Sequence, residues 1–150
     1  MASSTPETRP SVVLDSNVVL DCFVFENAEC SGLLGAITSG AVAWKATHEM
    51  REELFRVVSL GHLSAWRPDS ARLSEQWRRW CVESLPPATS APAGRLRCTD
   101  PDDQKFIDFA VSVGARWLVS RDRAVLKLAR RLREHGVEVV TPPNWSSPAS

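Results

Sequence analysis

Short apolar runs alternate with longer amphipathic segments along most of the chain. Strands are predicted where β-branched and other apolar residues run together, at residues 11–15, 41–45, 116–120 and 137–142. Helices are predicted where apolar residues recur at helical spacing, at residues 17–25, 29–40, 48–58, 70–81, 100–114 and 122–136. This alternation favours an α/β fold of three layers, in which helices cover both faces of a central parallel sheet of roughly four to five strands.

Residues at the ends of these segments are typical of helix boundaries. Thr47 is a suitable N-cap for the helix at 48–58, and Asp69 or Ser70 for the next one. Glycines stand where three of the helices are expected to end: Gly40, Gly61 and Gly136. The helix after Asp69 carries an apolar stripe that we expect to pack in the core rather than to stack on nucleic-acid bases: Leu73, Trp77, Trp80 and Cys81.

The length and composition favour one domain with unstructured ends. A chain of 150 residues is most simply a single domain. Residues 1–10 are rich in Ser, Thr and Pro and are expected to be disordered, residues 11–145 to form the domain, and residues 146–150 to be a tail. The final segment from Pro143 is expected either to be unstructured or to pack only through Trp145. The stretch "PPATSAPAGR" at residues 86–95 predicts a linker or long loop inside the domain.

The overall charge is balanced, but its distribution is uneven. The 18 basic and 18 acidic residues cancel, so the total does not argue for nucleic acid or membrane. Between residues 116 and 133, however, Asp122 is the one acid among seven basic side chains: Arg116, Arg121, Arg123, Lys127, Arg130, Arg131 and Arg133. This segment is either a solvated helix face or a surface that meets phosphates.

The cysteines and the hydropathy exclude several classes of protein. None of the four cysteines forms a C-x-x-C pair, and no His stands at zinc spacing. The sequence has no apolar run of about 20 residues and no signal peptide. We therefore expect a cytoplasmic protein with reduced thiols and no membrane partner.

Acidic residues follow the predicted strands at matching places. Asp15 ends the strand at 11–15, directly after apolar residues that read as buried, and Asp122 follows the strand at 116–120. In a parallel sheet the carboxyl ends of the strands share one edge, where ligands commonly bind. Two further groups lie on neighbouring helices. Glu49, Glu52 and Glu53 are on the helix after the strand at 41–45, and Asp100, Asp102 and Asp103 open the helix that leads into the strand at 116–120.

Carboxylates gathered at one edge repel each other and favour a bound cation. Their mutual repulsion raises their pKa values, and a divalent cation removes the conflict. Mg²⁺ prefers oxygen ligands, and two such ions can clamp the attacking and leaving oxygens of a phosphodiester. Each acid also has a purely structural interpretation, because Asp15, Asp100 and Asp122 can cap helices and the glutamates can form a solvated face. The joint pattern is what favours a metal site.

Four segments in this order resemble the PIN-domain family. They are "VVLDSNVVLDCFVF", "THEMREELFRVV", "DPDDQKFIDFAVSVGARWLVSRDRAVLKLA" and "GVEVVTPPNW", and together they cover about residues 12–145. The resemblance is greatest to the branch of toxin components of toxin–antitoxin pairs, the VapC-like ribonucleases. It implies a metal-dependent ribonuclease with a three-layer fold and a parallel sheet.

The resemblance also assigns the site residues. The family's acids fall on Asp15, Glu53, Asp103 and Asp122 as ligands of Mg²⁺ or Mn²⁺, one or two ions, and as catalytic residues. Spacing alone does not separate Glu53 from Glu49 or Glu52. Many relatives carry a second acid just after the last one, but this chain has Arg123, Ala124 and Val125 there, so a second metal site is expected to be weaker. Three auxiliary polar residues complete the site: Ser16, Asn17 and Ser120.

From this site follows a specific hypothesis about chemistry and partners. In-line attack of water on an RNA phosphodiester leaves a 3′-hydroxyl and a 5′-phosphate, with Asp15 as a shared metal ligand and Glu53 ligating the ion or orienting the water. Flanking phosphates are assigned to four basic residues: Arg121, Arg123, Lys127 and Arg130. The family resemblance implies a cognate antitoxin protein and a homodimer as partners.

Three other interpretations compete with the ribonuclease. One is a PIN-like nucleic-acid or protein binding module that has lost catalysis. A phosphoryl-transferring hydrolase needs an Asp two residues after its nucleophilic Asp, and this chain has Asn17 there. A phosphorylation receiver needs an acidic pair that the N-terminal stretch lacks.

Overall fold

The computed structural model describes residues 9–60, 69–86, 98 and 101–146. The strands are β1 (Ser11–Leu14), β2 (Ala43–Ala46), β3 (Cys81–Glu83), β4 (Trp117–Val119) and β5 (Glu138–Val140). The α-helices are α1 (Ser16–Phe23), α2 (Ser31–Ser39), α3 (His48–Ser59), α4 (Ser70–Trp80), α5 (Pro101–Ser112), α6 (Arg123–Leu126) and α7 (Ala129–Arg133). Two 3₁₀ turns, η2 (Ala28–Cys30) and η4 (Pro142–Asn144), complete the described elements.

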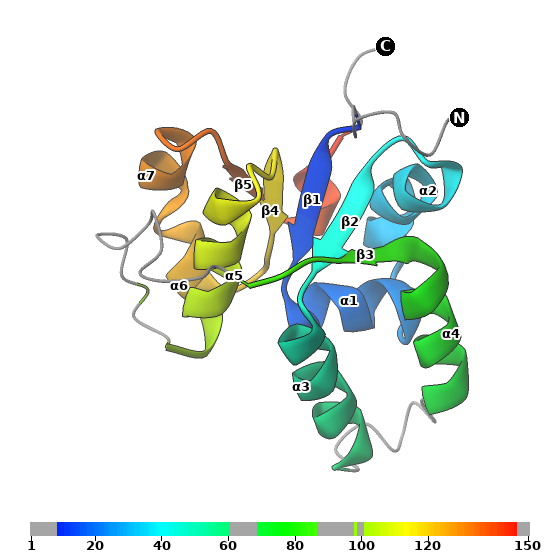
Figure 1. Cartoon of the computed structure of the whole chain (residues 1–150). Helices are drawn as coiled ribbons and strands as arrows, with labels where there is room; N and C mark the ends of the chain where they lie inside the picture. Colours follow the sequence, from blue (N-terminus) through cyan, green and yellow to red (C-terminus); the bar gives the residue numbers. More distant parts are fainter. Residues whose placement is uncertain (1–8, 61–68, 87–97, 99–100, 147–150) are drawn as a thin grey trace, which may run out of the picture.

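The five strands form one parallel sheet in the order β3-β2-β1-β4-β5 (Figure 1). The chain enters the sheet in the central strand β1 and moves outward through β2 to the edge strand β3. It then crosses back to β4 on the other side of β1. The order therefore reverses between β1 and β4, which is where ligands bind in sheets of this kind. The predicted α/β class with a parallel sheet is confirmed.

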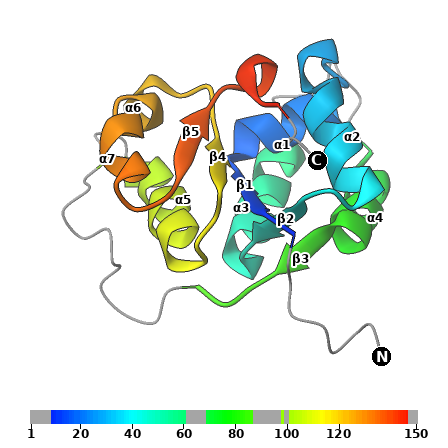
Figure 2. The same cartoon turned by 90° about the horizontal axis from the view of Figure 1, so that it is seen from above.

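Helices cover both faces of this sheet. Helix α5 packs on β1 and β4 from one side, and α1 lies on the opposite face (Figures 1 and 2). The central strand is buried throughout, with Val12 and Val13 fully inaccessible to solvent. This two-sided burial explains why the strand sequences read as continuous apolar runs rather than as alternating ones.

Aromatic side chains fill much of the core. Trp44 on β2 stacks on Phe23 at a ring-centroid distance of 5.2 Å and meets Trp77 edge-on at 5.0 Å. The prediction that Trp77 belongs to the core is confirmed, because only 3% of this residue is exposed. Trp145 packs edge-on against Trp117 at 5.3 Å, so the C-terminal segment contacts β4 through this residue, which is one of the two alternatives expected for it.

The predicted helix starts are confirmed at two places. Thr47 Oγ1 accepts a hydrogen bond from the Met50 amide, and the Asp69 carboxylate accepts one from Arg72. Gly40 ends α2 with a φ of 85°, a left-handed conformation that glycine adopts without strain.

Two predicted elements are wrong. The helix predicted at residues 70–81 ends at Trp80. Strand β3 begins at Cys81, because the backbone from this residue pairs with β2. The single helix predicted at residues 122–136 is two short helices, α6 and α7, with a turn at Lys127 and Leu128. Val125 and Leu132 are both fully buried, and the turn lets each of these two short helices pack its own apolar residue into the core.

Several predictions lie outside the described residues. These concern Gly61, Asp100, most of the 86–95 loop, residues 1–8 of the N-terminal tail and residues 147–150 of the C-terminal tail. Of the predicted N-terminal tail, Pro10 is described and its carbonyl accepts a hydrogen bond from Ala43 at the start of β2. Among the described helices, none is both long and apolar enough to cross a membrane.

Candidate active site

The register of the two central strands places Asp15 beside Ser120. Leu14 at the end of β1 pairs with Val119 at the end of β4, so the next residue of each strand leaves the sheet at the same edge. The Asp15 amide still donates to the Val119 carbonyl, at 3.2 Å. Both residues are buried, with 3% of Asp15 and none of Ser120 exposed. The strand ends therefore bring two polar side chains, 105 positions apart, into a site with little access to water.

Ser120 links two of the predicted acids. Its hydroxyl donates to Asp15 Oδ2 at 2.5 Å and accepts from the Asp122 amide at 3.0 Å. One small side chain therefore fixes the orientation of the Asp15 carboxylate and the path of the backbone into Asp122. Ser120 was predicted as an auxiliary residue, and the hydrogen bond to a carboxylate is one of the roles expected for it.

Both acids also cap helices, as their structural interpretation predicts. Asp15 Oδ1 accepts from the Val18 amide at 2.9 Å at the start of α1, and Asp122 Oδ1 accepts from Ala124 at 2.8 Å at the start of α6. A cap uses one of the acceptor positions of a carboxylate, which offers about four in all. Capping therefore orients these side chains without using up their capacity to bind a cation.

The environment of Asp15 disfavours its charge. Burial is the largest influence and raises the pKa of Asp15 above its ordinary value of 3.8. The hydrogen bonds from Ser120 and the Val18 amide act in the opposite direction, while the nearby negative charges of Asp122 and Asp21 raise the pKa further. A carboxylate held in this position gains more from a bound cation than an exposed one does.

Asp21 is a neighbour of the site that the sequence interpretation missed. Its side chain on α1 is 15% exposed, and its carboxylate accepts a hydrogen bond from Arg121 Nε at 2.8 Å. Arg121 also binds Glu29 at 2.7 Å, and these two acids raise the pKa of its guanidinium. Arg121 was assigned to RNA phosphates, but in this structure it joins the end of β4 to α1 and η2. Its Asp21 contact spans 100 positions, so no local pattern could have indicated it.

Helices α3 and α5 carry the other two predicted acids. Glu53 on α3 forms an ion pair with Lys105 on α5 at 2.9 Å, and Lys105 also donates to the Asp102 carbonyl. Asp103 is buried in the first turn of α5. Of the three glutamates that the sequence left open, Glu53 faces α5, whereas Glu52 pairs with His48 at 3.3 Å and Glu49 is exposed. Ser16 is half-buried and Asn17 exposed at the start of α1.

The described side chains do not form a ready-made metal cage. Within residues 9–60, 69–86, 98 and 101–146, no group of three or more His, Cys, Asp or Glu is placed to hold an ion. The contacts bring Asp15, Ser120 and Asp122 together, while Glu53 pairs with Lys105 instead. The donor set nevertheless fits Mg²⁺ or Mn²⁺, because it consists only of carboxylate and hydroxyl oxygens around a desolvated acid. Mg²⁺ commonly uses one or two carboxylates and keeps several waters.

Comparison with known proteins identifies the family. The sequence profile described as PIN domain matches residues 11–124, which extend from β1 into α6 and include all four predicted acids. Among curated proteins, none matches the chain significantly. PIN domains are generally nucleases, which supports a nuclease-type function and agrees with acids at the switch point of a parallel sheet. Because the match covers about three quarters of its 150 residues, the chain belongs to the PIN domain family.

Proposed function

We propose that the protein is a Mg²⁺- or Mn²⁺-dependent endoribonuclease and the toxin of a toxin–antitoxin pair. The observation that carries the enzymatic part is the buried Asp15 carboxylate, which shares Ser120 with Asp122 at the switch point of the sheet. Burial and neighbouring charge raise the pKa of this carboxylate, so a divalent cation is a fitting partner for it. The toxin role, a cognate antitoxin and a homodimer rest on the family resemblance.

The acids divide the work in this proposal. Asp15, Asp103 and Asp122 would hold the ion, which when bound polarises the phosphoryl oxygen and activates water. Glu53 either completes the ligand set or accepts a proton from the attacking water, and Lys105 holds it near α5. The water oxygen bonds to phosphorus as the bond from phosphorus to the 3′-oxygen breaks. The departing 3′-oxygen takes up a proton, which balances the one lost by the attacking water, so the products are a 3′-hydroxyl and a 5′-phosphate.

Cleavage is expected to require a divalent cation. RNA hydrolysis should stop with EDTA and return when Mn²⁺ or Mg²⁺ is added in excess, because the carboxylates alone supply no electrophile. The measurement is the appearance of 5′-phosphate ends on a labelled RNA. The Asp15→Asn protein, purified in parallel, controls for a contaminating nuclease. Cleavage that persists in EDTA, at the rate seen with Mn²⁺, contradicts the proposal.

A second candidate function is a PIN domain that binds nucleic acid or protein without cleaving. Two observations favour it: the described residues include no preformed group of three metal-binding side chains, and Arg123, Ala124 and Val125 follow Asp122 where many relatives have an acid. The same experiment separates the two functions. RNA that is retained by the protein but stays intact with Mn²⁺ identifies the binding module.

The basic residues next to Asp122 are the proposed track for the RNA backbone. Arg123 on α6, Lys127 in the turn after it and Arg130 on α7 are exposed, and they form no ion pair with any described residue. Arg123 and Lys127 are one helical turn apart, since the Lys127 amide donates to the Arg123 carbonyl, and Arg130 follows in α7 after the turn at Lys127 and Leu128. Arg121 makes intramolecular ion pairs, so we assign it a smaller share of RNA binding than its neighbours.

Neutralising this track should weaken RNA binding in a salt-dependent way. Arg123→Gln combined with Lys127→Gln removes two cations, so the slope of log affinity against log salt should become shallower by about 1.4 for single-stranded RNA. Binding is measured by fluorescence anisotropy in the Asp15→Asn background. The matched control is Arg72→Gln with Arg79→Gln on α4, which should leave the slope unchanged. Equal changes in both pairs contradict the assignment.

A further inference from the structure

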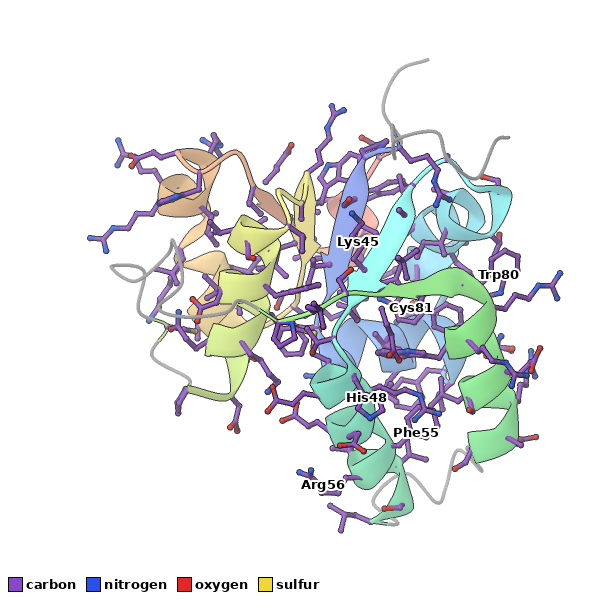
Figure 3. The ribbon with its side chains drawn as sticks, viewed as in Figure 1. Lys45, His48, Phe55, Arg56, Trp80 and Cys81 are labelled. Atoms are coloured by element: carbon purple, nitrogen blue, oxygen red, sulfur yellow. The ribbon has the colours of Figure 1, made fainter. Side chains whose placement is uncertain are left out.

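A pocket lies on the side of α3 that faces away from α5. It has a volume of about 440 Å³ and is bounded by α3, α4 and β3. Figure 3 shows Phe55 on the flank of α3 that faces α4 and Arg56 on the other flank. The volume falls within the range of small-ligand sites, about 300–1,000 Å³. Neither the metal chemistry nor the basic track of α6 and α7 uses this pocket.

Arg51 is the notable side chain of the pocket wall. It is half-buried, one guanidinium nitrogen donates to Ser74 Oγ at 2.9 Å, and the group lies over the Phe55 ring at 4.5 Å. Among the described residues no carboxylate pairs with it. Serine and phenylalanine therefore hold a positive charge in place, and the bond to Ser74 uses one of the five donor hydrogens of the guanidinium. Such a fixed guanidinium fits a phosphate, which it can bind with two parallel hydrogen bonds.

Glu83 gives the pocket a fixed acceptor. The Trp77 indole donates to Glu83 Oε2 at 2.9 Å, and His48 lies 3.7 Å from Oε1. Of the remaining charges, Arg78 pairs with Glu75 and His48 also meets Glu52. A ligand that satisfies both Arg51 and Glu83 needs an anionic group and a hydrogen-bond donor. A nucleotide whose base carries an exocyclic amino group has both, and carboxylates accept well from the amino group of cytosine.

The pocket shares residues with a second cavity at the edge of the sheet where β2 and β3 end. This second cavity, of about 360 Å³, has His48 and Glu83 in common with the pocket and is also lined by Thr47 and Ser84. These residues directly follow β2 and β3, just as Asp15 and Ser120 follow β1 and β4. In a parallel sheet these strand ends lie along one edge, so a strand of RNA can reach both places.

We propose that this pocket binds one nucleotide of the RNA substrate away from the cleaved bond, with its phosphate on Arg51 and the amino group of its base on Glu83. The inference rests on the proposed ribonuclease function, of which it names a substrate subsite. It assigns Arg51 and Glu83 to specificity rather than to catalysis. It also distinguishes cytosine from uracil, since uracil presents an acceptor where cytosine presents the amino donor.

The test compares Arg51→Gln with Arg56→Gln, which removes the same charge from the same helix on its other flank. Binding of oligocytidine and oligouridine is measured by anisotropy in the Asp15→Asn background, with thermal melting as the check on folding. We expect Arg51→Gln to weaken oligocytidine binding about 10-fold and Arg56→Gln to change it less than 2-fold. Arg51→Lys keeps the charge but loses the planar guanidinium, so its affinity for oligocytidine should lie between those of the wild type and Arg51→Gln. This variant replaces Arg51→Gln in the test if the Gln variant does not fold.

Glu83→Gln gives an independent readout. Its side-chain oxygen can still accept from Trp77, but the carboxylate is lost, so the preference for oligocytidine over oligouridine should shrink. Equal weakening by Arg51→Gln and Arg56→Gln, or a base preference that Glu83→Gln does not alter, overturns the proposal. A third outcome is that Arg51→Gln weakens the binding of cytidine monophosphate but not that of oligocytidine. This result overturns the substrate subsite and identifies a site for free nucleotide instead. Binding is measured without cleavage, so the two proposals fail in different assays. Failure of the ribonuclease function leaves RNA intact in the cleavage assay, whereas failure of the subsite appears only in the binding of the oligonucleotides.

Discussion

Asp15→Asn is expected to abolish RNA cleavage and, at the same time, to stabilise the metal-free protein. The substitution preserves the shape of the side chain, its acceptor for the Val18 amide and a hydrogen bond with Ser120. It removes the charge that a cation needs, so cleavage should fall by about 1,000-fold or more. It also removes a carboxylate that burial disfavours, which should raise the free energy of unfolding by about 1 kcal/mol and the Tm by about 2–4 °C.

The pH dependence of this stabilisation has a definite sign. The pKa of Asp15 is raised in the folded state, so the unfolded chain ionises first as the pH rises above 3.8. The wild-type protein therefore loses stability from that pH up to the folded pKa, and the variant does not. The difference in stability between the two proteins should be small below pH 3.8, grow as the pH rises, and stop growing above the folded pKa of Asp15.

Metal titration provides the matched measurement. Mg²⁺ or Mn²⁺ at about ten times its dissociation constant should stabilise the wild-type protein by about 1.4 kcal/mol, and Asp15→Asn should show no such rise in Tm. Asp69→Asn is the control for loss of a capping carboxylate, because Asp69 caps α4 on the surface. Wild-type activity in Asp15→Asn, with contaminating metal and nuclease excluded, contradicts a role for this carboxylate in catalysis.

The part of this site that sequence could predict follows from the ends of the strands. Asp15 and Ser120 are far apart in the chain, yet each directly follows an apolar run, and parallel strands share an edge. Thr47 and Asp69 were predictable for a similar reason, since a helix cap is a local signal. These predictions needed only the spacing of the apolar residues along the chain and the identity of the polar residue next to each predicted strand or helix.

Contacts that depend on tertiary packing could not be predicted. Strand β3 is three residues long and follows α4 without a break, and it forms because β2 offers a free edge rather than because "CVE" favours a strand. The ion pairs of Arg121 with Asp21 and Glu29 join three elements that no periodicity relates. The turn at Lys127 carries no Gly or Pro, so only the packing of Val125 and Leu132 explains it.

Ser120→Ala should damage stability and activity together. The variant loses the donor to Asp15 Oδ2 and the acceptor for the Asp122 amide, at a position with no exposed surface. Leaving buried polar groups unsatisfied should cost about 2 kcal/mol at neutral pH, which lowers the Tm by about 4–8 °C. A less firmly oriented Asp15 should reduce the cleavage rate about 10–100-fold. Ser112→Ala, at an exposed position on α5, is the control for loss of a hydroxyl.

A double-mutant cycle tests whether this serine acts through the charge of Asp15. The Ser120 hydrogen bond lowers the pKa of Asp15, so it stabilises the ionised carboxylate more than the protonated one. The cost of Ser120→Ala should therefore shrink as the pH falls through the folded pKa of Asp15, and it should be smaller in the Asp15→Asn background at neutral pH. A coupling of about 1 kcal/mol is expected for groups in direct contact. Strict additivity at both pH values would mean that Ser120 only fills space at the end of β4, and that the carboxylate is positioned by its helix cap alone.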